Sequence, residues 1–403
     1  METKILPKKE KQIIYLGSSR FPYGFAETQK IILISQSLIY ANNRVTVVCN
    51  KGVYNEKDHP ELKETGYYNG IEYVFTSGNP FNAEKFIKRN LLKIKGIYKE
   101  WQFIKNRKKR NELDCAVLST HSFYSVLYCY LLSRIYGFRI VLNYVEFYSK
   151  VKKKWYQFKY IINDILFDRF APSLSDGLLP ISEFLIDHLK KVSPSKKYLK
   201  LPGLTDFGRY NDTDILHGEK YFLFCGNVSY MEIIEFILDA YKTLTNTSAF
   251  LYLVISGNHE KINELKIRIS VSPSAERIKI FSHLTERELF TYYRNAIALL
   301  IPLRPTFQDV ARFPHKTGEY LASGNPVIST NYGEIKYYFK DKQNMLLAET
   351  YDIDLFAEKM QFAIDNPELI KEIGINGKNI ALQLFDYKGK AENLNQFFDE
   401  IIN

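Results

Sequence analysis

The sequence of 403 residues has little cysteine and no long apolar run. Its four cysteines, Cys49, Cys115, Cys129 and Cys225, show neither a metal-ligand spacing nor a disulfide framework, which indicates a reducing compartment. No stretch of about 18 uninterrupted apolar residues occurs, so we expect no membrane-spanning helix. The N-terminal segment METKILPKKEKQIIYLG lacks the apolar core of a signal peptide, and we therefore expect a cytoplasmic location.

Acidic residues are scarce in the first half of the chain. Residues 1–200 hold 34 Lys and Arg against 18 Asp and Glu, whereas the remainder holds 21 against 27. A basic half joined to a mildly acidic half indicates two domains with different partners. Basic proteins commonly bind nucleic acid, anionic lipid or phosphorylated ligands. Because no helix-turn-helix, zinc-finger or RNP-like pattern accompanies the charge, we expect no nucleic-acid partner.

The hydrophobic pattern alternates between strands and helices in two blocks. Strands are expected at 13–17, 44–50, 71–75, 115–120, 139–145 and 177–182, and then at 220–226, 250–257, 277–283, 297–302 and 326–330. Between the blocks, Gly, Pro and Asp cluster in LKLPGLTDFGRYND, as is typical of a linker. The pattern predicts two open parallel sheets with helices on both faces, each with a binding crevice at the carboxyl ends of its strands.

The segment 301–338 carries the most specific pattern. Pro314 suits the first turn of a short helix and Gly324 suits its left-handed end. The free N–H groups at the start of this helix favour an anion such as a diphosphate. Lys316 and Glu319 share one face of the helix, and they suit the phosphate and the ribose diol of a sugar nucleotide. The alternative is an ordinary ion pair on a surface helix.

The sequence ARFPHKTGEYLASGNPVIST within this segment resembles the donor-nucleotide motif of retaining glycosyltransferases of family four, in the branch with an FPxKxxEYLAxGxPVI pattern. The resemblance extends over nearly the whole chain. Residues 21–50 resemble the family's first loop, helix and second strand, LPGLTDFGRY resembles its interdomain linker, and FCGNVSY and DKQNMLLAE resemble two segments of its nucleotide domain.

This resemblance implies an α/β fold of the GT-B type, in which two Rossmann-like, doubly wound domains face each other across a cleft. We expect an N-terminal, acceptor-side domain at 1–205, joined by a helix at about 386–403 that returns to it, and a C-terminal, nucleotide-sugar-binding domain at 206–385. The resemblance also implies sugar transfer from a UDP- or GDP-linked donor with retention of configuration, and without a metal or another cofactor.

The family's donor-site roles carry over to several residues of the C-terminal domain. Glu319 matches the glutamate that binds the ribose hydroxyls. A second family glutamate lies eight residues earlier, where this chain has Ala311, and Asp309 is the nearest acid. The lysine that many members carry after the first loop of this domain is also absent. Arg312 and Lys316 then remain to neutralise the diphosphate, unless Arg312 is only the structural partner of an acid in its own loop.

Five further positions complete the expected site. Asn227 and Gly333 lie in loops at the donor crevice, and Gly24 in the first loop lets the backbone approach the donor or acceptor. His121 matches a family histidine that lines the sugar pocket, and Glu146 follows a strand on the acceptor side. A structural histidine and a surface acid are the alternatives. We expect His121, Arg312 and Lys316 to be catalytic without a covalent nucleophile, chiefly by stabilising the departing diphosphate.

Two basic stretches suggest where the acceptor lies. Residues 85–110 contain eleven Lys and Arg, interleaved with apolar side chains, and only one acid, Glu100, and VKKKWYQFKY at 151–160 is similar. Such stretches suit an anionic membrane surface, although a solvated basic face is the alternative. A glycan or a polyprenyl-phosphate-linked acceptor is therefore expected. The protein would then be peripheral on the cytoplasmic face of the membrane, in bacterial surface-polysaccharide synthesis.

Other functions remain open at this point. Within enzymes, a GT-B phosphorylase or a sugar-nucleotide epimerase is an alternative. Outside them, the alternative is a weakly catalytic subunit that binds a sugar nucleotide for a partner transferase. Ala311 and the absent lysine are the reasons for considering this binding subunit.

Overall fold

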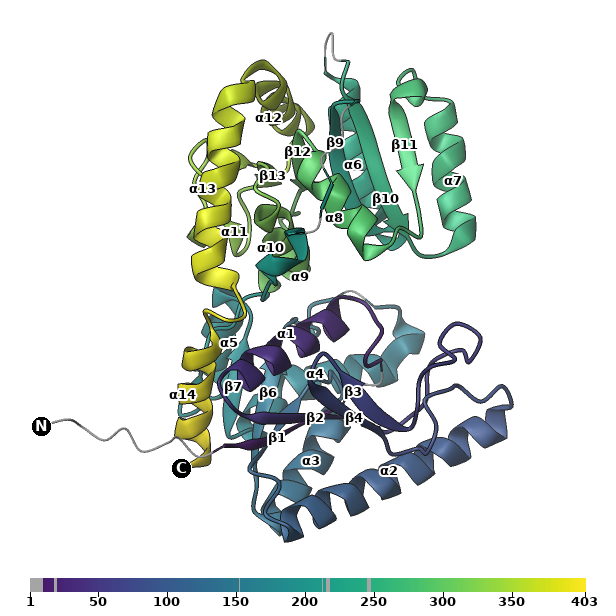
Figure 1. Ribbon diagram of the computed structural model, residues 1–403, viewed down its shortest axis with the longest axis vertical. Coiled ribbons are helices and arrows are strands. Elements are labelled where there is room, and N and C mark those ends of the chain that lie inside the picture. The colour runs from purple at the N-terminus through teal and green to yellow at the C-terminus, as the bar shows by residue number, and fades with distance from the viewer. Residues whose placement is uncertain (1–9, 18–19, 152, 212, 215–217, 245–247) are drawn as a thin grey trace, which may run out of the picture. The chain divides into compact units, whose positions relative to one another are not determined.

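The computed structural model of the chain divides into two compact units (Figure 1). It describes residues 10–17, 20–151, 153–211, 213–214, 218–244 and 248–403. The first unit comprises residues 1–204 together with 387–403, and the second comprises residues 205–386. Each unit contains one sheet whose strands are mainly parallel, which confirms the predicted α/β class with two doubly wound sheets.

The sheet of the first unit has the order β3-β4-β2-β1-β5-β6-β7-β8, and only β3 and β4 pair antiparallel. Its strands are β1 (Gln12–Leu16), β2 (Arg44–Cys49), β3 (Thr65–Tyr68), β4 (Ile71–Phe75), β5 (Cys115–Leu118), β6 (Arg139–Tyr144), β7 (Gly177–Pro180) and β8 (Lys197–Tyr198). The central strands are nearly continuous apolar runs because both faces of a parallel sheet are buried. The edge strands β3 and β8 are too exposed to show this signal, and the sequence did not predict them.

Helices cover both faces of this sheet, since parallel strands are joined by right-handed crossovers. The helices are α1 (Ala26–Tyr40), α2 (Phe86–Lys109), α3 (Phe123–Tyr136), α4 (Phe158–Leu174), preceded by η1 (Trp155–Gln157), α5 (Glu183–Val192) and α14 (Ala391–Ile402). The chain moves one way along the sheet from β1 to β2 and the other way from β4 through β7. Helix α1, with α14 beside it, therefore covers one face, and α2, α3 and α4 cover the other (Figure 1).

The C-terminal helix α14 is part of the first unit, as the sequence predicted. Leu394 and Phe398 have no exposed surface. Lys11 donates a hydrogen bond to Asn395 Oδ1 at 2.6 Å and lies 2.7 Å from an oxygen of Asp399. The helix thus ties the end of the chain to the residues just before β1.

The sheet of the second unit is entirely parallel, in the order β11-β10-β9-β12-β13-β14. Its strands are β9 (Tyr221–Asn227), β10 (Phe250–Ser256), β11 (Ile278–Phe281), β12 (Ala298–Ile301), β13 (Val327–Thr330) and β14 (Leu346–Ala348). The order reverses between β9 and β12, and in open α/β sheets the ligand crevice lies at such a switch point.

Eight α-helices and three short 3₁₀ helices accompany this sheet in the described part of the second unit. They are η2 (Phe207–Tyr210), η3 (Val228–Tyr230), α6 (Met231–Lys242), α7 (His259–Ser270), η4 (Ala275–Arg277), α8 (Glu286–Asn295), α9 (Phe307–Ala311), α10 (His315–Ala322), α11 (Ile335–Tyr338), α12 (Ile353–Asp365) and α13 (Pro367–Phe385). The predicted helix at 315–322 is α10, whereas the short α9 before it was not expected.

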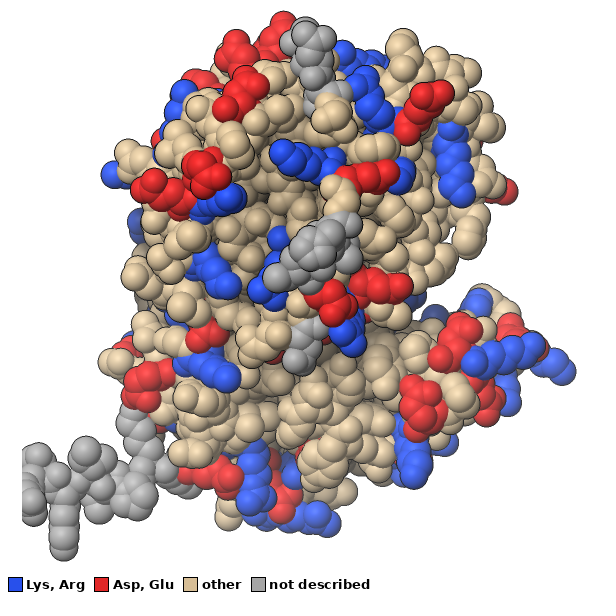
Figure 2. All heavy atoms as spheres, turned by 45° about the horizontal axis from the view of Figure 1, so that its top comes forward, with Lys and Arg blue, Asp and Glu red and all other residues tan. Residues whose placement is uncertain are grey.

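Two further features concern the charged residues of the surface and the length and hydropathy of the helices. On the face shown in Figure 2, basic and acidic residues are interspersed. Among the helices of the described residues, none is both long and apolar enough to cross a bilayer.

Candidate active site

The predicted donor residues of the second unit lie around α9 and α10, after the ends of β12 and β13. Thr306 caps α9 by accepting a hydrogen bond from the N–H of Asp309 at 3.2 Å. Helix α10 begins after Pro314, and no side chain caps its N-terminus. Gly333 has a left-handed φ of 59°, and a Cβ there would lie 3.0 Å from the carbonyl oxygen of Asp309. Glycine therefore lets the turn after β13 pack directly against α9.

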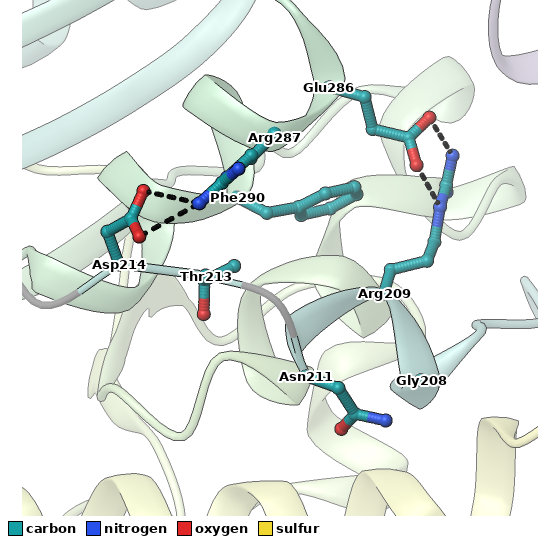
Figure 3. A pocket seen from close by; sticks show the side chains of 8 residues that line it. All are labelled: Gly208, Arg209, Asn211, Thr213, Asp214, Glu286, Arg287 and Phe290. Atoms are coloured by element: carbon teal, nitrogen blue, oxygen red, sulfur yellow. Dashed lines mark hydrogen bonds and ion pairs between the residues drawn. The ribbon is translucent and has the colours of Figure 1, made fainter.

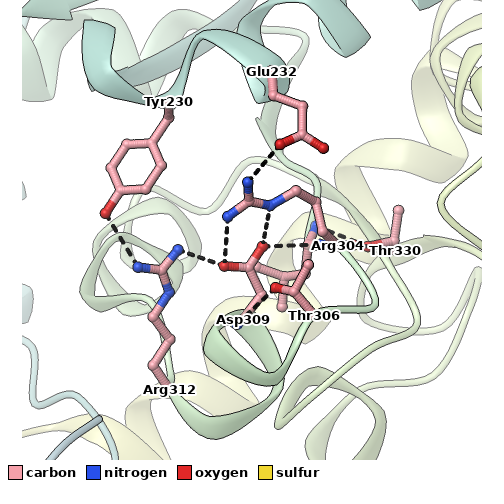
Figure 4. A network of polar contacts seen from close by, with 8 residues as sticks. Tyr230, Glu232, Arg304, Thr306, Asp309, Arg312 and Thr330 are labelled. Atoms are coloured by element: carbon pink, nitrogen blue, oxygen red, sulfur yellow. Dashed lines mark hydrogen bonds and ion pairs between the residues drawn. The ribbon is translucent and has the colours of Figure 1, made fainter. Parts of the chain in front are cut away.

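Asp309 is the centre of a buried ionic network (Figure 4). Its carboxylate has no exposed surface. Arg304 donates to Oδ2 from Nε at 2.8 Å and from its backbone N–H at 3.1 Å, and Arg312 donates to Oδ1 at 2.6 Å. Burial raises the pKa of Asp309, but these hydrogen bonds and the Arg312 charge outweigh it and lower the pKa overall. Asp309 therefore holds two guanidinium groups, and its predicted contact with the donor remains a prediction.

The two arginines of this network also contact η3 and the first turn of α6, which follow β9. Arg312 donates to the hydroxyl of Tyr230 at 3.1 Å and lies over its ring at 5.3 Å, with 16% of its side chain exposed. Arg304 donates to Glu232 at 2.8 Å. The structure thus confirms that Arg312 is paired with an acid of its own loop. It also places Arg304, which the sequence analysis missed, beside the loop where the family's lysine is absent.

Glu319 lies close to two cationic side chains, Arg209 and Lys316, and to the imidazole of His315. Its carboxylate lies 3.5 Å from Nε2 of His315, 3.8 Å from Nη1 of Arg209 and 3.9 Å from Nζ of Lys316, and its side chain is 11% exposed. These distances allow ion pairing but are too long for hydrogen bonds. The carboxylate therefore keeps its capacity to accept hydrogen bonds from a ligand. Lys316 is oriented by Tyr293, whose hydroxyl lies 3.3 Å from its ammonium group.

An open pocket lies beside Arg209 (Figure 3). It has a volume of about 770 Å³ and is lined by Gly208, Arg209, Asn211, Thr213, Asp214, Glu286, Arg287 and Phe290. Arg209 donates two hydrogen bonds to Glu286, at 2.9 and 2.7 Å, and its guanidinium lies 4.9 Å from the centre of the Phe290 ring. Arg209 thereby connects the pocket with Glu319. Asp212, in the predicted linker, lies outside the described residues.

Asn227 organises the loop that follows β9. Its Oδ1 accepts a hydrogen bond from the N–H of Ser229 at 2.9 Å and so caps η3. Its Nδ2 lies 3.5 Å from the hydroxyl of Ser256 at the end of β10. The residue therefore sits at the switch point of the sheet, where we expect the donor, and its present contacts are within the loop and with β10.

The predicted residues of the first unit gather around Tyr148. The His121 ring lies 5.5 Å from that of Tyr148, and both Glu146 and Glu27 raise the pKa of the Tyr148 hydroxyl, although burial is the larger cause. Glu27 accepts a hydrogen bond from Ser119 Oγ at 3.4 Å. The pKa of Glu27 is raised because protein atoms desolvate it, an effect that His121 opposes. Glu27 was not among the residues expected from the sequence, because it precedes β5 by almost ninety residues and lies in no recognisable motif.

Gly24 is required for a local reason. A Cβ at this position would lie 2.1 Å from Oγ1 of Thr28, whose hydroxyl donates to the carbonyl of Arg20. The glycine therefore allows the loop after β1 to close against the first turn of α1. Whether its backbone also contacts a ligand remains a prediction.

The structure thus brings together Asp309, Arg312 and Gly333 in one cluster, Lys316 and Glu319 in a second, and His121 and Glu146 in a third. The first two belong to the second unit, and the third belongs to the first unit. Within the described ranges, no group of three or more His, Cys, Asp or Glu side chains has the arrangement of a metal site.

Residues 211–380 match the family model for glycosyl transferases group 1. An uncharacterized glycosyltransferase of Methanocaldococcus jannaschii is 23% identical over 237 residues, or 58% of this chain. The chain spans 62% of the length of this curated relative. The matched family region contains Asn227, the Asp309 network and Glu319.

Solved structures match nearly the whole chain. A sucrose-phosphate synthase from Thermosynechococcus elongatus superposes with a TM-score of 0.75 at 15% identity, covering 97% of this chain and 99% of that one. The Anabaena protein HepE, solved in complex with UDP-glucose, superposes with a TM-score of 0.65 at 13% identity, again with 97% and 99% coverage. At these identities the likeness shows the fold, which is GT-B.

Proposed function

We propose that this chain is a retaining glycosyltransferase that moves a sugar from a nucleotide-sugar donor to a glycan or lipid-linked acceptor. The observation that carries the proposal is the Glu319 carboxylate, which lies near the cations Arg209 and Lys316 and the His315 ring but accepts no hydrogen bond from any described residue. It lies within the region that matches glycosyl transferases group 1. A nucleoside diphosphate supplies what this arrangement lacks, namely hydroxyl donors for the carboxylate and anionic oxygens for the cations.

The donor is proposed to be UDP- or GDP-linked, with its nucleotide in the second unit. Glu319 accepts hydrogen bonds from the ribose hydroxyls, and Lys316 faces the diphosphate. The complex of HepE with UDP-glucose supports a uridine nucleotide. Asn227 and Gly333 line the same crevice and contribute backbone contacts.

Catalysis is proposed to depend on charge placed before the reaction begins. As the bond to the sugar breaks, negative charge develops on the diphosphate, and Arg312 and Lys316 stabilise it. Asp309 and Tyr230 hold the Arg312 guanidinium in place, so little reorganisation is needed. These cations supply the positive charge that a divalent metal supplies in other transferases, and we therefore propose a metal-independent reaction without another cofactor.

The acceptor is proposed to bind the first unit, where His121, Glu27 and Glu146 surround Tyr148. On this proposal His121 lines the sugar pocket and Glu146 contacts the acceptor. The departing diphosphate helps to accept the proton of the acceptor, as front-face attack with retention requires. We propose a role in bacterial surface-polysaccharide synthesis at the cytoplasmic face of the membrane.

An exposed apolar face of the first unit supports a membrane location. On α2, the exposed Ile87, Leu91, Ile94 and Tyr98 follow one another at spacings of three and four residues. At about 100° per residue these side chains share one face, and the buried Gly96 lies on the opposite face. Helix α2 therefore presents an apolar stripe to its outside.

Helices α3 and α4 extend this surface. More than half of the exposed large apolar side chains in the described part of the chain belong to α2, α3, η1 and α4. Besides the α2 stripe they are Phe86, Ile97, Tyr124, Leu131, Ile135, Trp155, Tyr156, Phe158, Tyr160, Ile162, Ile165 and Phe170.

The charge of α2 indicates which partner covers this face. Of the residues at 85–110, the one acid, Glu100, is buried and accepts a hydrogen bond from Asn50. The eleven basic residues thus have no exposed acid among them. An anionic lipid surface matches both the apolar stripe and this charge. Lys152, in the second basic stretch, lies outside the described residues.

A thermal-shift screen of nucleoside diphosphates tests the donor proposal, since a ligand that binds only the folded protein raises its melting temperature. We expect UDP or GDP to stabilise the protein more than ADP and more than inorganic phosphate. Equal shifts with all of them would contradict a site that recognises a nucleotide.

One observation favours a second candidate function, a subunit that binds a nucleotide sugar for a partner transferase. The buried Ala311 stands where the family has a glutamate, so this position supplies no carboxylate to the donor sugar. Slow hydrolysis of the nucleotide sugar without an acceptor distinguishes the two functions, because a pure binding subunit leaves the donor intact.

A further inference from the structure

A second cavity lies in the first unit, where the loops after β1 and β2 meet the first turns of α2. Its volume is about 230 Å³. It is lined by Arg20, Lys51, Gly52, Val53, Phe81, Asn82, Ala83, Arg89, Leu92 and Lys93. Both loops follow carboxyl ends of parallel strands, the edge at which α/β proteins bind ligands.

Four of the lining side chains are cations, and none is an acid. Among the residues that the structure describes, Arg20, Lys51, Arg89 and Lys93 form no ion pair with a carboxylate. The arginines of the second unit differ, since Arg304 and Arg209 each bind carboxylates. Four positive charges around one small cavity repel each other, and a bound anion weakens that repulsion. An arginine guanidinium can also donate two parallel hydrogen bonds to two oxygens of the same phosphate group.

The same cavity has an apolar wall made by Val53, Phe81, Ala83 and Leu92. Gly52 fixes part of it, because a Cβ at Gly52 would lie 2.3 Å from the carbonyl oxygen of Phe81. A free phosphate ion uses only the charged side of such a site. A phosphate attached to an apolar chain uses both sides.

The cavity also adjoins the proposed acceptor side. The Lys51 charge lowers the pKa of Glu27, together with His121 and Ser119 and against the larger effect of desolvation. The carbonyl of Arg20, another lining residue, accepts a hydrogen bond from the hydroxyl of Thr28, which follows Glu27 on α1. Three of the lining residues, Arg89, Leu92 and Lys93, belong to α2, which carries the exposed apolar stripe.

We propose that this cavity binds the phosphate or diphosphate group of a lipid-linked acceptor. Arg20, Lys51, Arg89 and Lys93 hold the phosphoryl oxygens, while Val53 and Leu92 contact the first carbons of the lipid. This inference rests on the proposed acceptor side of the first unit, and it adds the cavity and the side chains that hold the phosphate of such an acceptor. It assigns no bond-breaking step to the cavity.

Isothermal titration with two probes, pyrophosphate and farnesyl diphosphate, tests the proposal. Both are titrated in the presence of excess UDP and GDP, so that the proposed donor site is occupied by whichever nucleotide it binds. We expect farnesyl diphosphate to bind the wild-type chain at least tenfold more tightly than pyrophosphate. The Arg89→Gln/Lys93→Gln variant should lose at least tenfold in affinity for both. The matched control is Lys261→Gln/Lys266→Gln, which removes two exposed charges from α7 and should bind as the wild type does.

Three results would overturn the proposal or part of it. Unchanged binding of both probes to the Arg89→Gln/Lys93→Gln variant would remove the cavity as a phosphate site. Equal affinities for pyrophosphate and farnesyl diphosphate would contradict the lipid and favour a soluble phosphate ester. If the α7 control lost as much affinity for the probes, the loss would come from the change in net charge and not from the cavity.

The proposed function fails in a different way. If no nucleoside diphosphate bound while farnesyl diphosphate still bound through Arg89 and Lys93, the donor proposal would fall and the phosphate site would stand. A circular dichroism melt of each variant confirms that it is folded before titration.

Discussion

The Glu319 carboxylate lies near the positively charged Arg209 and Lys316, and no described residue uses its capacity to accept hydrogen bonds. This carboxylate lies 3.8 Å from the guanidinium of Arg209 and 3.9 Å from the ammonium of Lys316, so it is paired with positive charge while its oxygens remain available for hydrogen bonds. Asp309, by contrast, accepts hydrogen bonds from Arg304 at 2.8 Å and from Arg312 at 2.6 Å. The contrast between these two acids, ten residues apart, supports the proposal that Glu319 binds a ligand and that Asp309 positions other side chains.

Replacing Glu319 tests its assignment directly. Glu319→Ala leaves two ribose hydroxyls without a partner, and we expect a loss of about 1–3 kcal/mol in nucleotide affinity, or roughly 10–100-fold. Isothermal titration with UDP and GDP measures it. The control Glu264→Ala removes an exposed acid from α7 and should leave the affinity unchanged. Wild-type affinity in the Glu319→Ala protein would move the donor site elsewhere.

Lys30 is a buried residue whose titration should be visible in stability. It lies on α1, is 7% exposed, and its ammonium has no hydrogen-bond partner among the described residues. Burial lowers the pKa of Lys30 from 10.5 to about 7. Between these values the unfolded chain holds the proton and the folded chain does not, so the free energy of unfolding rises with pH across this range.

The Lys30→Met variant removes this titration while keeping the shape of the side chain. We expect Lys30→Met to be more stable than the wild type at pH 6.5, and the gap to shrink as the pH approaches 10. Urea unfolding at both pH values measures the difference. A gap that does not change with pH would show that Lys30 finds a partner in solution.

At the scale of elements, α2 explains how a basic helix can carry its apolar side outward. A Cβ at Gly96 would lie 1.8 Å from the carbonyl oxygen of Asn50, so this glycine lets the helix pack against the loop after β2. That contact buries Gly96, Glu100 and Ile104 and turns the opposite stripe to the outside. The basic and aromatic alternation of 85–110 was evident from the sequence, but which side is buried depends on this close approach.

The apolar stripe of α2 should determine membrane binding. We expect the wild-type chain to co-sediment with phosphatidylglycerol vesicles, more weakly in high salt, and not with phosphatidylcholine vesicles. The variant Ile87→Ser/Leu91→Ser/Ile94→Ser should lose most of this binding. Its matched control, Ile267→Ser/Val271→Ser, changes exposed apolar residues at α7 and should bind normally.

Trp155 offers an independent reading of the same surface. The chain has two tryptophans, and the Trp101→Phe variant leaves only Trp155, which is 84% exposed. Its fluorescence should shift to the blue when anionic vesicles are added, since the indole enters the interface. An unshifted spectrum would contradict membrane binding by this face. If the Ile87→Ser/Leu91→Ser/Ile94→Ser variant dimerised less but bound vesicles as the wild type does, the face would instead bind a second copy of the chain.

At the scale of the whole molecule, the two α/β sheets followed from hydrophobic alternation because buried parallel strands are continuous apolar runs. One local motif predicted Arg312, Lys316 and Glu319, which the structure places in two neighbouring clusters, Arg312 with Asp309 and Lys316 with Glu319. Arg209, which comes from the linker, and Glu27 in the first unit did not, because each reaches its site through contacts distant in sequence. The contact between His315 and Glu319 could have been predicted from the sequence, since the two residues are one helical turn apart.

Metal dependence is a property of the complete reaction. With Arg312 and Lys316 as the charges that face the diphosphate, we expect transfer or donor hydrolysis to keep its rate in EDTA. The measurement compares initial rates with EDTA and with added Mg²⁺ or Mn²⁺. A rate that disappears in EDTA and returns with the metal would contradict this mechanism.

The most direct test is release of the nucleoside diphosphate from a panel of UDP- and GDP-sugars, without acceptor, by the wild-type chain and the Arg312→Gln and Glu319→Ala variants. We predict slow release from at least one sugar nucleotide and a loss of about 100-fold in the Arg312→Gln variant, the usual effect of one contact to a developing charge. No release from any donor, or equal release by all three proteins, would contradict the account of this chain as a glycosyltransferase with its donor site in the second unit.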